Sequence, residues 1–213
     1  MQKEDVAQVT AIDREAFPTL WPPVNYQHEL QNKLAHYVVA CKDEGIVEES
    51  KAEVSTGRGF LHLMSRVRRL FDHNRFFSNK LPPSAKQYIV GFAGFWMMAG
   101  EAHIINIAVQ ESYRRQGIGE LLLISIIDRA LELNAQIVTL EVRVSNTAAR
   151  TLYSNYGFVQ VGLRRGYYSD NREDGVLLST EDISLDSFQS HFQQLKQAYS
   201  GKWGVALSHH ITL

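Results

Sequence analysis

Two side chains in the middle of the chain combine the chemistry of a proton acceptor and a proton donor. Glu141 interrupts an otherwise apolar run over residues 137–144, which has the length and composition of a buried strand. A buried carboxylate is unfavourable unless it is paired or used, so Glu141 has either a structural partner or a function. Arg143, two residues later on the same strand face, is the structural candidate. These residues alone leave both interpretations open.

Tyr153 lies on the short helix that follows this strand. Ser145-Asn146 is typical of a helix N-cap, and Gly157 is typical of the residue just past a helix end. Tyr153 shares a helix face with Ala149 and Tyr156. It is therefore either a packed core aromatic or a phenol that can give up a proton.

A basic, glycine-containing turn precedes the long helix of the chain. The strand expected over residues 103–109 leads into Arg114-Arg115-Gln116-Gly117-Ile118-Gly119-Glu120, where an apolar helix begins. Glycines let the backbone approach a ligand, and the free N–H groups at a helix start bind anions. Two arginines add fixed positive charge. The turn indicates a pyrophosphate site, and the alternative is a plain glycine turn with solvated arginines.

Two familiar phosphate-binding motifs fit this turn incompletely. A P-loop requires Gly-Lys-Ser/Thr at the helix start, whereas Glu120 and Leu121 follow Gly119. A dinucleotide-binding fingerprint requires a third glycine where Leu122 stands. Glu141 does lie at a distance suited to a ribose-binding acid, so the dinucleotide interpretation stays as a rival.

Taken together, these segments resemble a known family. RRQGIG at 114–119, followed by LEVRVSNTAARTLYSNYGF at 140–158, is similar to the acetyl-CoA-binding core of the GNAT acetyltransferases. The resemblance is closest to the RimI-like group, the ribosomal-protein N-terminal alanine acetyltransferases. RRGYYSDNREDGVLLS at 164–179 and DREAFPTLWP at 13–22 resemble that group as well. The resemblance covers residues 1–41 and 87–181.

The resemblance implies a fold and a set of roles. The fold class is α/β (α+β): a mixed, mostly antiparallel central sheet flanked by helices. Glu141 would act as general base through a water and Tyr153 as general acid, at the family's spacing. Acetyl-CoA would be the co-substrate, with no metal and no covalent acetyl-enzyme. The implied coenzyme-binding residues are Ile107, Ala108, Val109, Arg114, Arg115, Gln116, Gly117, Ile118, Gly119, Glu120, Asn146 and Tyr153.

The implied acceptor is the N-terminal α-amine of a protein or peptide. One wall of its groove would come from the Phe17, Pro18 and Trp21 loop, and the other from Tyr167 and Tyr168. Two facing aromatic loops make a narrow slot that suits a chain terminus. An α-amine has a pKa of about 8 against about 10.4 for lysine, so it needs only modest help to lose a proton. A lysine or small-molecule amine as acceptor, and a non-catalytic acyl-CoA-binding module, are the alternatives.

Composition narrows the remaining classes. The chain has 213 residues, 45% of them hydrophobic, and a net charge of −1, so no overall positive field favours nucleic acid. Cys41 is the only cysteine, which excludes an internal disulfide and suits a reducing compartment. The N-terminal residues lack the apolar stretch of a signal peptide, and no apolar run approaches the length of a membrane span. We expect a cytoplasmic enzyme.

The domain organisation departs from the family in two places. We expect an acetyltransferase domain over residues 1–181, interrupted by an insertion at 42–86, and a C-terminal extension over 182–213 that packs on the domain. The insertion holds a basic amphipathic helix over 60–71, which would pack on its own domain, contact a partner or dimer mate, or lie on a membrane surface. In the extension, apolar residues at helical spacing predict a helix that stops at Gly201, and the final residues could add a strand.

The remaining elements follow from periodicity and turn residues. We expect helices over 4–16 and 26–34 and strands over 37–41, 87–98 and 103–109, the last two forming a hairpin. A second hairpin would join 158–165 to 176–180, with Tyr167 and Tyr168 in its loop.

Overall fold

The computed structural model describes residues 1–19, 24–42, 88–203 and 208–212. Trp21 and the basic helix expected over 60–71 lie outside these residues. Residues Met1–Lys42 and Ile89–Leu213 form one compact unit, and the description below concerns that unit.

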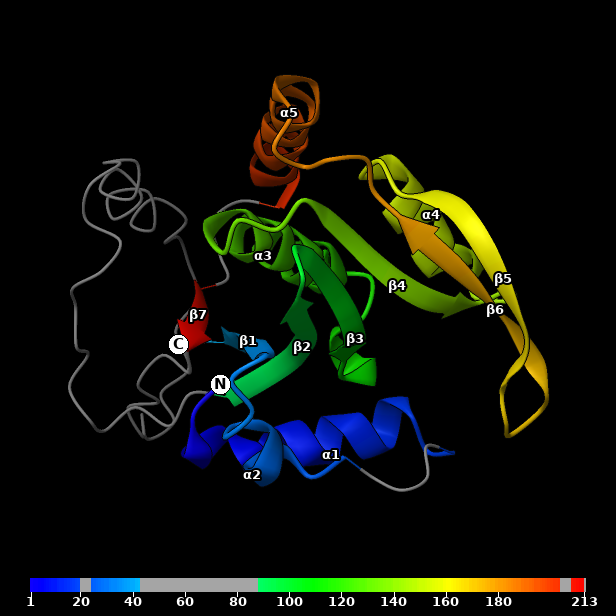
Figure 1. Ribbon diagram of the computed structural model, residues 1–213. Helices are drawn as coiled ribbons and strands as arrows, with labels where there is room; N and C mark the ends of the chain where they lie inside the picture. The colour runs from blue at the N-terminus through cyan, green and yellow to red at the C-terminus, as the bar shows by residue number, and fades with distance from the viewer. Residues whose placement is uncertain (20–23, 43–87, 204–207, 213) are drawn as a thin grey trace, which may run out of the picture. The chain divides into compact units, whose positions relative to one another are not determined.

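The unit is built on a seven-stranded sheet (Figure 1). Its strand order is β5-β6-β4-β3-β2-β1-β7. β3 and β4 run parallel, whereas the β2–β3, β4–β6, β5–β6 and β1–β7 pairs are antiparallel, so the expected mixed, mostly antiparallel sheet is confirmed. The strands are β1 Ala35–Lys42, β2 Tyr88–Met98, β3 Glu101–Val109, β4 Ile137–Arg143, β5 Val159–Tyr168, β6 Glu173–Ser179 and β7 Ser208–Thr212.

Helices cover both faces of the sheet, and each face has its own apolar core. Figure 1 shows α1 and α2, in blue, on the opposite side of the sheet from α3, in green. The cover of the α3 face also includes α4 and α5, which contribute Tyr153, Tyr156 and Phe192 to its core. The helices are η1 Lys3–Asp5, α1 Val6–Ala16, α2 Tyr26–Glu29, η3 Glu111–Tyr113, α3 Ile118–Glu132, α4 Thr147–Asn155 and α5 Asp186–Trp203.

Strand alternation decides which polar side chains share a face. Val138, Leu140 and Val142 of β4 lie in the core beneath α3. Their neighbours Thr139 and Glu141 therefore project to the α1–α2 face. On β3, Ala102 and Ile104 lie in the same core beneath α3, which places His103 on the α1–α2 face as well.

The parallel pair β3–β4 opens partway along its length. Its ladder runs from Glu101–Ile137 to Ile104–Leu140 and ends there. Beyond that point β4 pairs with β6, while β3 pairs only with β2. A register shift between Gly94 and Phe95 accompanies the opening. A Cβ atom at Gly94 would lie 2.3 Å from the Tyr37 ring, so glycine is needed at this irregularity.

The C-terminal helix is part of the same core. Phe188, Phe192 and Tyr199 of α5 are buried against the α3 side, and Lys196 Nζ lies 2.8 Å from a carboxylate oxygen of Asp128 on α3. The expected stop at Gly201 is wrong, since α5 continues to Trp203. A helical glycine needs no positive φ, and apolar packing on both sides of Gly201 outweighs its weak helix propensity.

Two further expectations are corrected. The second helix covers Tyr26–Glu29 and does not extend to residue 34, because a turn follows in which the Asn32 side chain accepts from the Leu34 N–H at 3.1 Å. Tyr167 and Tyr168 are the last residues of β5 and do not lie in the hairpin loop. Pairing of Tyr168 with Glu173 extends that hairpin beyond what the residue pattern indicated.

Candidate active site

Glu141 is the first residue of β4 beyond the point where β3 and β4 separate. Its side chain is only 7% exposed, and each carboxylate oxygen has a partner. Oε2 lies 3.0 Å from His103 Nε2, and Oε1 lies 2.8 Å from Arg164 Nε. Arg164 is 54% exposed, so it can leave the carboxylate at little cost, since exposed ion pairs contribute little free energy. Glu141 is thus buried and paired, yet it lies at the opening of the sheet.

Arg143 is not the partner of Glu141, contrary to the structural candidate that the sequence offered. Its guanidinium holds Asp170 at 2.8 and 3.0 Å and Glu173 at 3.3 Å, and it lies 3.9 Å from the Tyr168 ring centroid. Side chains two residues apart on a strand point in the same direction without meeting, so Arg143 instead contacts Asp170 of the β5–β6 turn and Glu173 at the start of β6.

His103 was not singled out from the sequence, although both of its ring nitrogens have polar partners at the site. Its Nε2 faces Glu141, and its Nδ1 lies 2.7 Å from the Thr139 hydroxyl. Thr139 in turn donates a short hydrogen bond to Glu101. A histidine in a strand is a weak signal by itself. Only the β3–β4 register, with His103 opposite Thr139, brings it to Glu141.

Tyr153 is buried on α4, with its ring 5.6 Å from that of Phe158. Burial raises the pKa of the Tyr153 phenol above its usual value, and the nearby Tyr168 phenol adds to the shift. The phenol therefore keeps its proton at neutral pH, as a proton donor must. Among the described residues, no hydrogen bond engages its hydroxyl.

The tyrosine pair of β5 lies next to these groups. The Tyr167 and Tyr168 rings are perpendicular, with centroids 5.1 Å apart. Burial, followed by the charge of Glu141, raises the pKa of Tyr167, whose residue is still 47% exposed. Burial is also the main cause that raises the pKa of Tyr168 to about 12. Both phenols are thus neutral hydrogen-bonding groups close to the Glu141 carboxylate.

A polar contact joins the two loops that were expected to form the peptide slot. The Thr19 hydroxyl donates to Asp170 Oδ2 at 2.8 Å, which ties the segment after α1 to the β5–β6 turn. The Thr19 hydroxyl first, and then Arg143, hold the pKa of Asp170 below its usual value, so Asp170 stays charged at neutral pH. Phe17 is half-buried and Pro18 exposed on the same segment. The contact links the segment that holds Phe17 and Pro18 to the turn that follows Tyr167 and Tyr168.

We predict that Thr19→Val raises the KM for a peptide acceptor about two- to tenfold, the usual range for one lost hydrogen bond. The change keeps the shape of the side chain and removes only its hydroxyl. Steady-state kinetics should show the effect on the peptide, while the Kd for acetyl-CoA stays unchanged. Ser200→Ala, which removes an exposed hydroxyl from α5, is the control. An unaltered peptide KM would mean that this contact plays no part in acceptor binding.

The basic turn lies between η3 and α3, and the backbone N–H groups at the start of α3 could bind an anion. Gly117 is the N-cap of α3 at φ 80°, and Arg115 also has a positive φ of 63°. Ile118, Gly119 and Glu120 form the first helical turn, whose N–H groups have no partner within the helix. Arg114, Arg115 and Gln116 are exposed. The helix dipole and the arginines together favour a bound phosphate here.

Backbone groups on β3 are available beside this turn. The Gln110 N–H bonds to the Val90 carbonyl of β2 at 3.0 Å. Alternation then turns the peptide groups of Ile107 and Val109 away from β2, and that of Ala108 toward it. The side chain of Arg114 contacts the end of β3, where its Nε–H donates to the Val109 carbonyl at 3.2 Å. The N–H and carbonyl of Ile107 and the N–H of Val109 therefore face the side where β4 has separated and can form strand-like hydrogen bonds there.

Two further coenzyme candidates have structural partners. Asn146 is exposed, and its side-chain oxygen caps α4 by accepting from the Ala149 N–H at 3.2 Å, which leaves its amide N–H groups for a ligand. Glu120 accepts from the Tyr156 hydroxyl at 2.9 Å and so ties α3 to α4.

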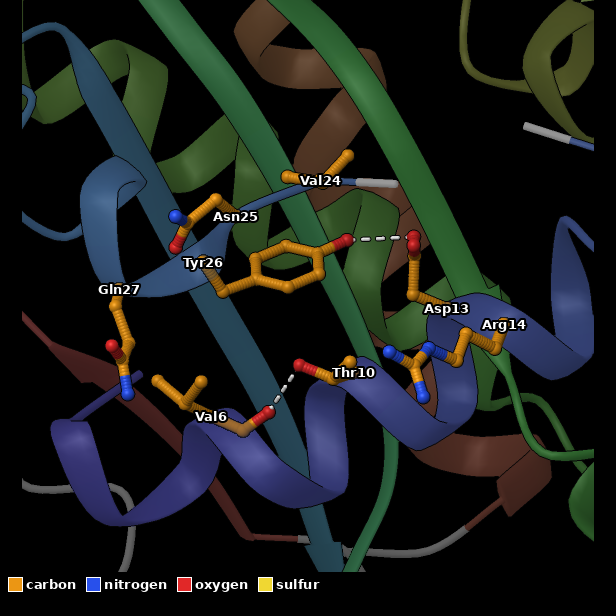
Figure 2. Close-up of a pocket in the computed structure, with 8 residues that line it drawn as sticks. All are labelled: Val6, Thr10, Asp13, Arg14, Val24, Asn25, Tyr26 and Gln27. Atoms are coloured by element: carbon orange, nitrogen blue, oxygen red, sulfur yellow. Dashed lines mark hydrogen bonds between the residues drawn. The ribbon is translucent and has the colours of Figure 1, made fainter. Parts of the chain in front are cut away.

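A separate hollow of about 420 Å³ lies between α1 and α2 (Figure 2). The buried Tyr26 hydroxyl points to Asp13 and donates to it at 2.6 Å. Burial raises the pKa of Asp13, and the bond from Tyr26 opposes this rise. Tyr26 also accepts from Asn106 of β3 at 3.2 Å, so this network fixes α2 against the sheet. The lining residues are Val6, Thr10, Asp13, Arg14, Val24, Asn25, Tyr26 and Gln27.

The described residues contain neither a metal-binding cluster nor a membrane-spanning helix. No three His, Cys, Asp or Glu side chains in the part of the chain that the structure describes are grouped to hold a metal ion. No helix in those same segments combines the length and apolarity that crossing a membrane requires.

Comparison with known proteins agrees with the fold. The profile of the acetyltransferase (GNAT) family matches residues 55–158. A putative [ribosomal protein bS18]-alanine N-acetyltransferase of Bacillus subtilis is 30% identical over 179 residues, 84% of this chain and 90% of that protein. An N-alpha-acetyltransferase of Sulfurisphaera tokodaii is 32% identical over 176 residues, 82% of this chain and 86% of that protein.

A solved structure extends the comparison to three dimensions. The crystal structure of the ribosomal-protein-S18-alanine N-acetyltransferase from Escherichia coli superposes with a TM-score of 0.58 and 24% identity, covering 85% of this chain and 90% of that one. At this identity the match shows a shared fold. Together with the two relatives aligned over most of their length, it establishes that the chain belongs to the GNAT family of acetyltransferases, whose acetyl donor is acetyl-CoA.

Proposed function

We propose that this chain transfers the acetyl group of acetyl-CoA to the N-terminal α-amine of a protein or peptide. The observation that carries the proposal is the opening of the sheet after Ile104–Leu140, with Glu141 as the first residue of β4 beyond it. The anion-binding turn lies at the end of the other strand of the opening. A thioester held along β3 would therefore present its carbonyl near Glu141.

The coenzyme would be held mainly by backbone. The N–H groups at the start of α3 would take the pyrophosphate, and Ile107 and Val109 would bond the pantetheine arm as a neighbouring strand does. One of these β3 N–H groups would stabilise the oxyanion. Such catalysis is mostly positioning of the two reactants.

Glu141 and Tyr153 would move the protons. Glu141, through a water, takes a proton from the ammonium form of the acceptor, and the free amine nitrogen then bonds to the thioester carbon. The C–S bond of the tetrahedral intermediate breaks, and the departing thiolate takes a proton from the Tyr153 phenol. The amide nitrogen then gives up its extra proton, which passes through water to the phenolate and restores the Tyr153 phenol. The neutral state of that buried phenol supports its assignment as donor.

We predict that Tyr153→Phe lowers kcat roughly 10²-fold, at the low end of the range for a general acid. The phenyl ring keeps the packing on Phe158, and the lost hydroxyl leaves no described partner unsatisfied. Thermal unfolding should therefore be nearly unchanged, while steady-state kinetics show a loss in kcat at constant KM. Tyr199→Phe, a buried tyrosine of α5, is the matched control. A wild-type kcat for Tyr153→Phe would exclude Tyr153 as the proton donor.

The choice of a peptide terminus as acceptor rests on two supports. The relatives from Bacillus subtilis and Sulfurisphaera tokodaii carry the names of protein N-terminal acetyltransferases. The Thr19–Asp170 bond also links the segment after α1 to the turn that follows Tyr167 and Tyr168, and two linked segments would suit an extended chain end more than a broad surface. A ribosomal protein is the acceptor class that the relative's name suggests, and it would place the enzyme in the cytoplasm.

The test is turnover of acetyl-CoA with a panel of short peptides that differ in their first residue. Coenzyme A release gives the rate, and mass spectrometry of the product locates the acetyl group. We expect modification of the free α-amine and none of a peptide with a blocked α-amine and a free lysine. Acetylation confined to the lysine, or to a small amine, would overturn the choice of acceptor. Acetyl-CoA binding without any turnover would indicate a binding module.

A further inference from the structure

The last residue of α5 lies against the turn that begins α3. A Cβ atom added at Gly117 would lie 2.7 Å from Trp203 Cε2 and 2.8 Å from its Nε1, so the indole ring occupies the space beside this glycine. Earlier in α5, Lys196 Nζ lies 2.8 Å from a carboxylate oxygen of Asp128, in the second half of α3. Successive contacts along α5 therefore move back along α3, and the helix of the C-terminal extension ends at the start of the anion-binding helix.

The turn has an unusual backbone that its surroundings must maintain. Arg115 has a φ of 63° and Gly117 a φ of 80°, and a residue with a side chain rarely adopts such values. Residues in these conformations persist where the surrounding structure holds them. Within its own segment the turn is tied by Gln116, whose Nε2 donates to the Ser112 carbonyl at 3.2 Å. The Trp203 ring adds a contact from a distant segment.

The conformation of Gly117 decides where the first donors of α3 point. Gly117 is the N-cap of this helix, and the peptide group that carries the Ile118 N–H turns with the ψ angle of Gly117. An unrestrained glycine adopts positive and negative φ about equally well. A turn that samples several conformations must be ordered when an anion binds, and this ordering weakens the binding. By filling the space beside Gly117, the Trp203 ring preorganises the donors that are expected to hold the pyrophosphate.

The ring holds its position by packing and not by a hydrogen bond. Among the described residues, Trp203 Nε1 is buried and has no hydrogen-bond partner. A buried donor without a partner is unfavourable, so the N–H is not the reason for the placement. Trp203 packs against the core beneath α3, and Lys202 Nζ lies 4.8 Å from the centroid of its ring. An aromatic ring without an N–H should therefore serve as well.

We propose that Trp203 is a positioning residue for the coenzyme. Its indole ring holds Gly117 in the conformation that aims the first N–H groups of α3 at the pyrophosphate. The C-terminal extension thereby becomes a part of the acetyl-CoA site, although Trp203 takes no part in the proton transfers. The inference rests on the proposed coenzyme site at 114–119, and it does not depend on the identity of the acceptor.

The binding test compares Trp203→Ala with Trp203→Phe by calorimetric titration of acetyl-CoA into the full chain. We expect the Kd to rise about tenfold or more in Trp203→Ala, because the coenzyme must then order the turn. Trp203→Phe keeps an aromatic ring and should stay within about threefold of the wild type. Steady-state kinetics should show the same rise in the KM for acetyl-CoA, while kcat and the KM for the peptide stay within about twofold.

Phe188→Ala is the matched control for a general loosening of α5. Phe188 is buried in the same core and stacks on Phe192, with ring centroids 6.1 Å apart. At the rise of an α-helix it lies about 22 Å from Trp203 along α5. Thermal unfolding should show at least as large a loss of stability as in Trp203→Ala, while the acetyl-CoA Kd stays within about twofold. Trp203→Leu, which keeps an apolar side chain, should give a Kd between those of the wild type and Trp203→Ala, and it serves alone if the alanine variant does not fold.

A spectroscopic readout tests the contact without any turnover. The chain has three tryptophans, so Trp21→Phe together with Trp96→Phe leaves Trp203 as the only one. The fluorescence of an indole depends on its surroundings. We expect acetyl-CoA to change the emission of Trp203, with the same Kd that calorimetry gives for this variant.

Four results would each overturn the proposal. They are an unchanged Kd in folded Trp203→Ala and Trp203→Leu, an equal rise in Phe188→Ala, a Kd for Trp203→Phe as high as that for Trp203→Ala, and Trp203 emission that does not respond to acetyl-CoA. Gly119→Asp separates this inference from the site on which it rests. If that variant weakens binding and Trp203→Ala does not, the site stands and the role of Trp203 fails. If neither weakens binding, the pyrophosphate lies elsewhere and both fail. A wild-type enzyme inactive toward α-amine peptides would instead overturn the proposed function and leave these Kd values as they are.

Discussion

Replacement of Glu141 by glutamine is expected to lower kcat roughly 10²–10⁴-fold at pH 7, the usual range for a general acid–base group. The change keeps the size of the side chain and removes the charge that lies between His103 and Arg164. Part of the rate should return at high pH, because an α-amine with a pKa of about 8 then deprotonates unaided. Steady-state kinetics across pH, with calorimetric titration of acetyl-CoA, would measure both effects.

The matched control for this prediction is Glu132→Gln, which alters an acid at the end of α3 that pairs with Arg129. It should leave kcat and pH dependence at the wild-type level. Thermal unfolding of Glu141→Gln is needed as well, since the buried site loses a charge while the Arg164 guanidinium beside it stays charged. If a folded Glu141→Gln enzyme keeps wild-type activity at pH 7, Glu141 is a structural partner of His103 and Arg164 and not the base.

Substitution of Gly119 by aspartate should weaken acetyl-CoA binding roughly 100-fold or more, which is about 2.8 kcal/mol. Among the described residues, an added Cβ at Gly119 meets only Val109 Cγ2, at 4.0 Å, so this part of the structure has room for the start of a side chain. The new carboxylate would lie at the start of α3, where the pyrophosphate is expected to bind, and two anions there repel each other. Calorimetric titration would measure the Kd.

Gly119→Ala is the control that separates steric from electrostatic effects, because it adds the Cβ without the charge. Gly117 is a poor choice for this purpose: its φ is 80°, and an added Cβ would lie 2.7 Å from the Trp203 ring. A change there would disturb the turn itself. Unchanged affinity in a folded Gly119→Asp protein would place the pyrophosphate elsewhere.

Local sequence patterns were enough to predict the strands, the turn and the helix start that hold the candidate site residues. Alternating apolar residues predicted β3, an apolar run predicted β4, and the glycines after Arg115 predicted the turn at the start of α3. Strand pleat and positive φ are properties of a few neighbouring residues, so these elements are local. The N-cap at Asn146 was predicted for the same reason and is present. The motifs that resemble the GNAT family also gave the fold class.

The tertiary structure decided what lies across from each side chain. Glu141 pairs with His103 and Arg164 because the β3–β4 register and the β5 strand bring distant segments together, and no local pattern records a register. Long-range contacts also extend α5 past Gly201 against the α3 core. The sequence by itself supplied Glu141 and Tyr153 as candidates for the chemistry, whereas the pairing of strands far apart in the chain determined which side chains lie next to them.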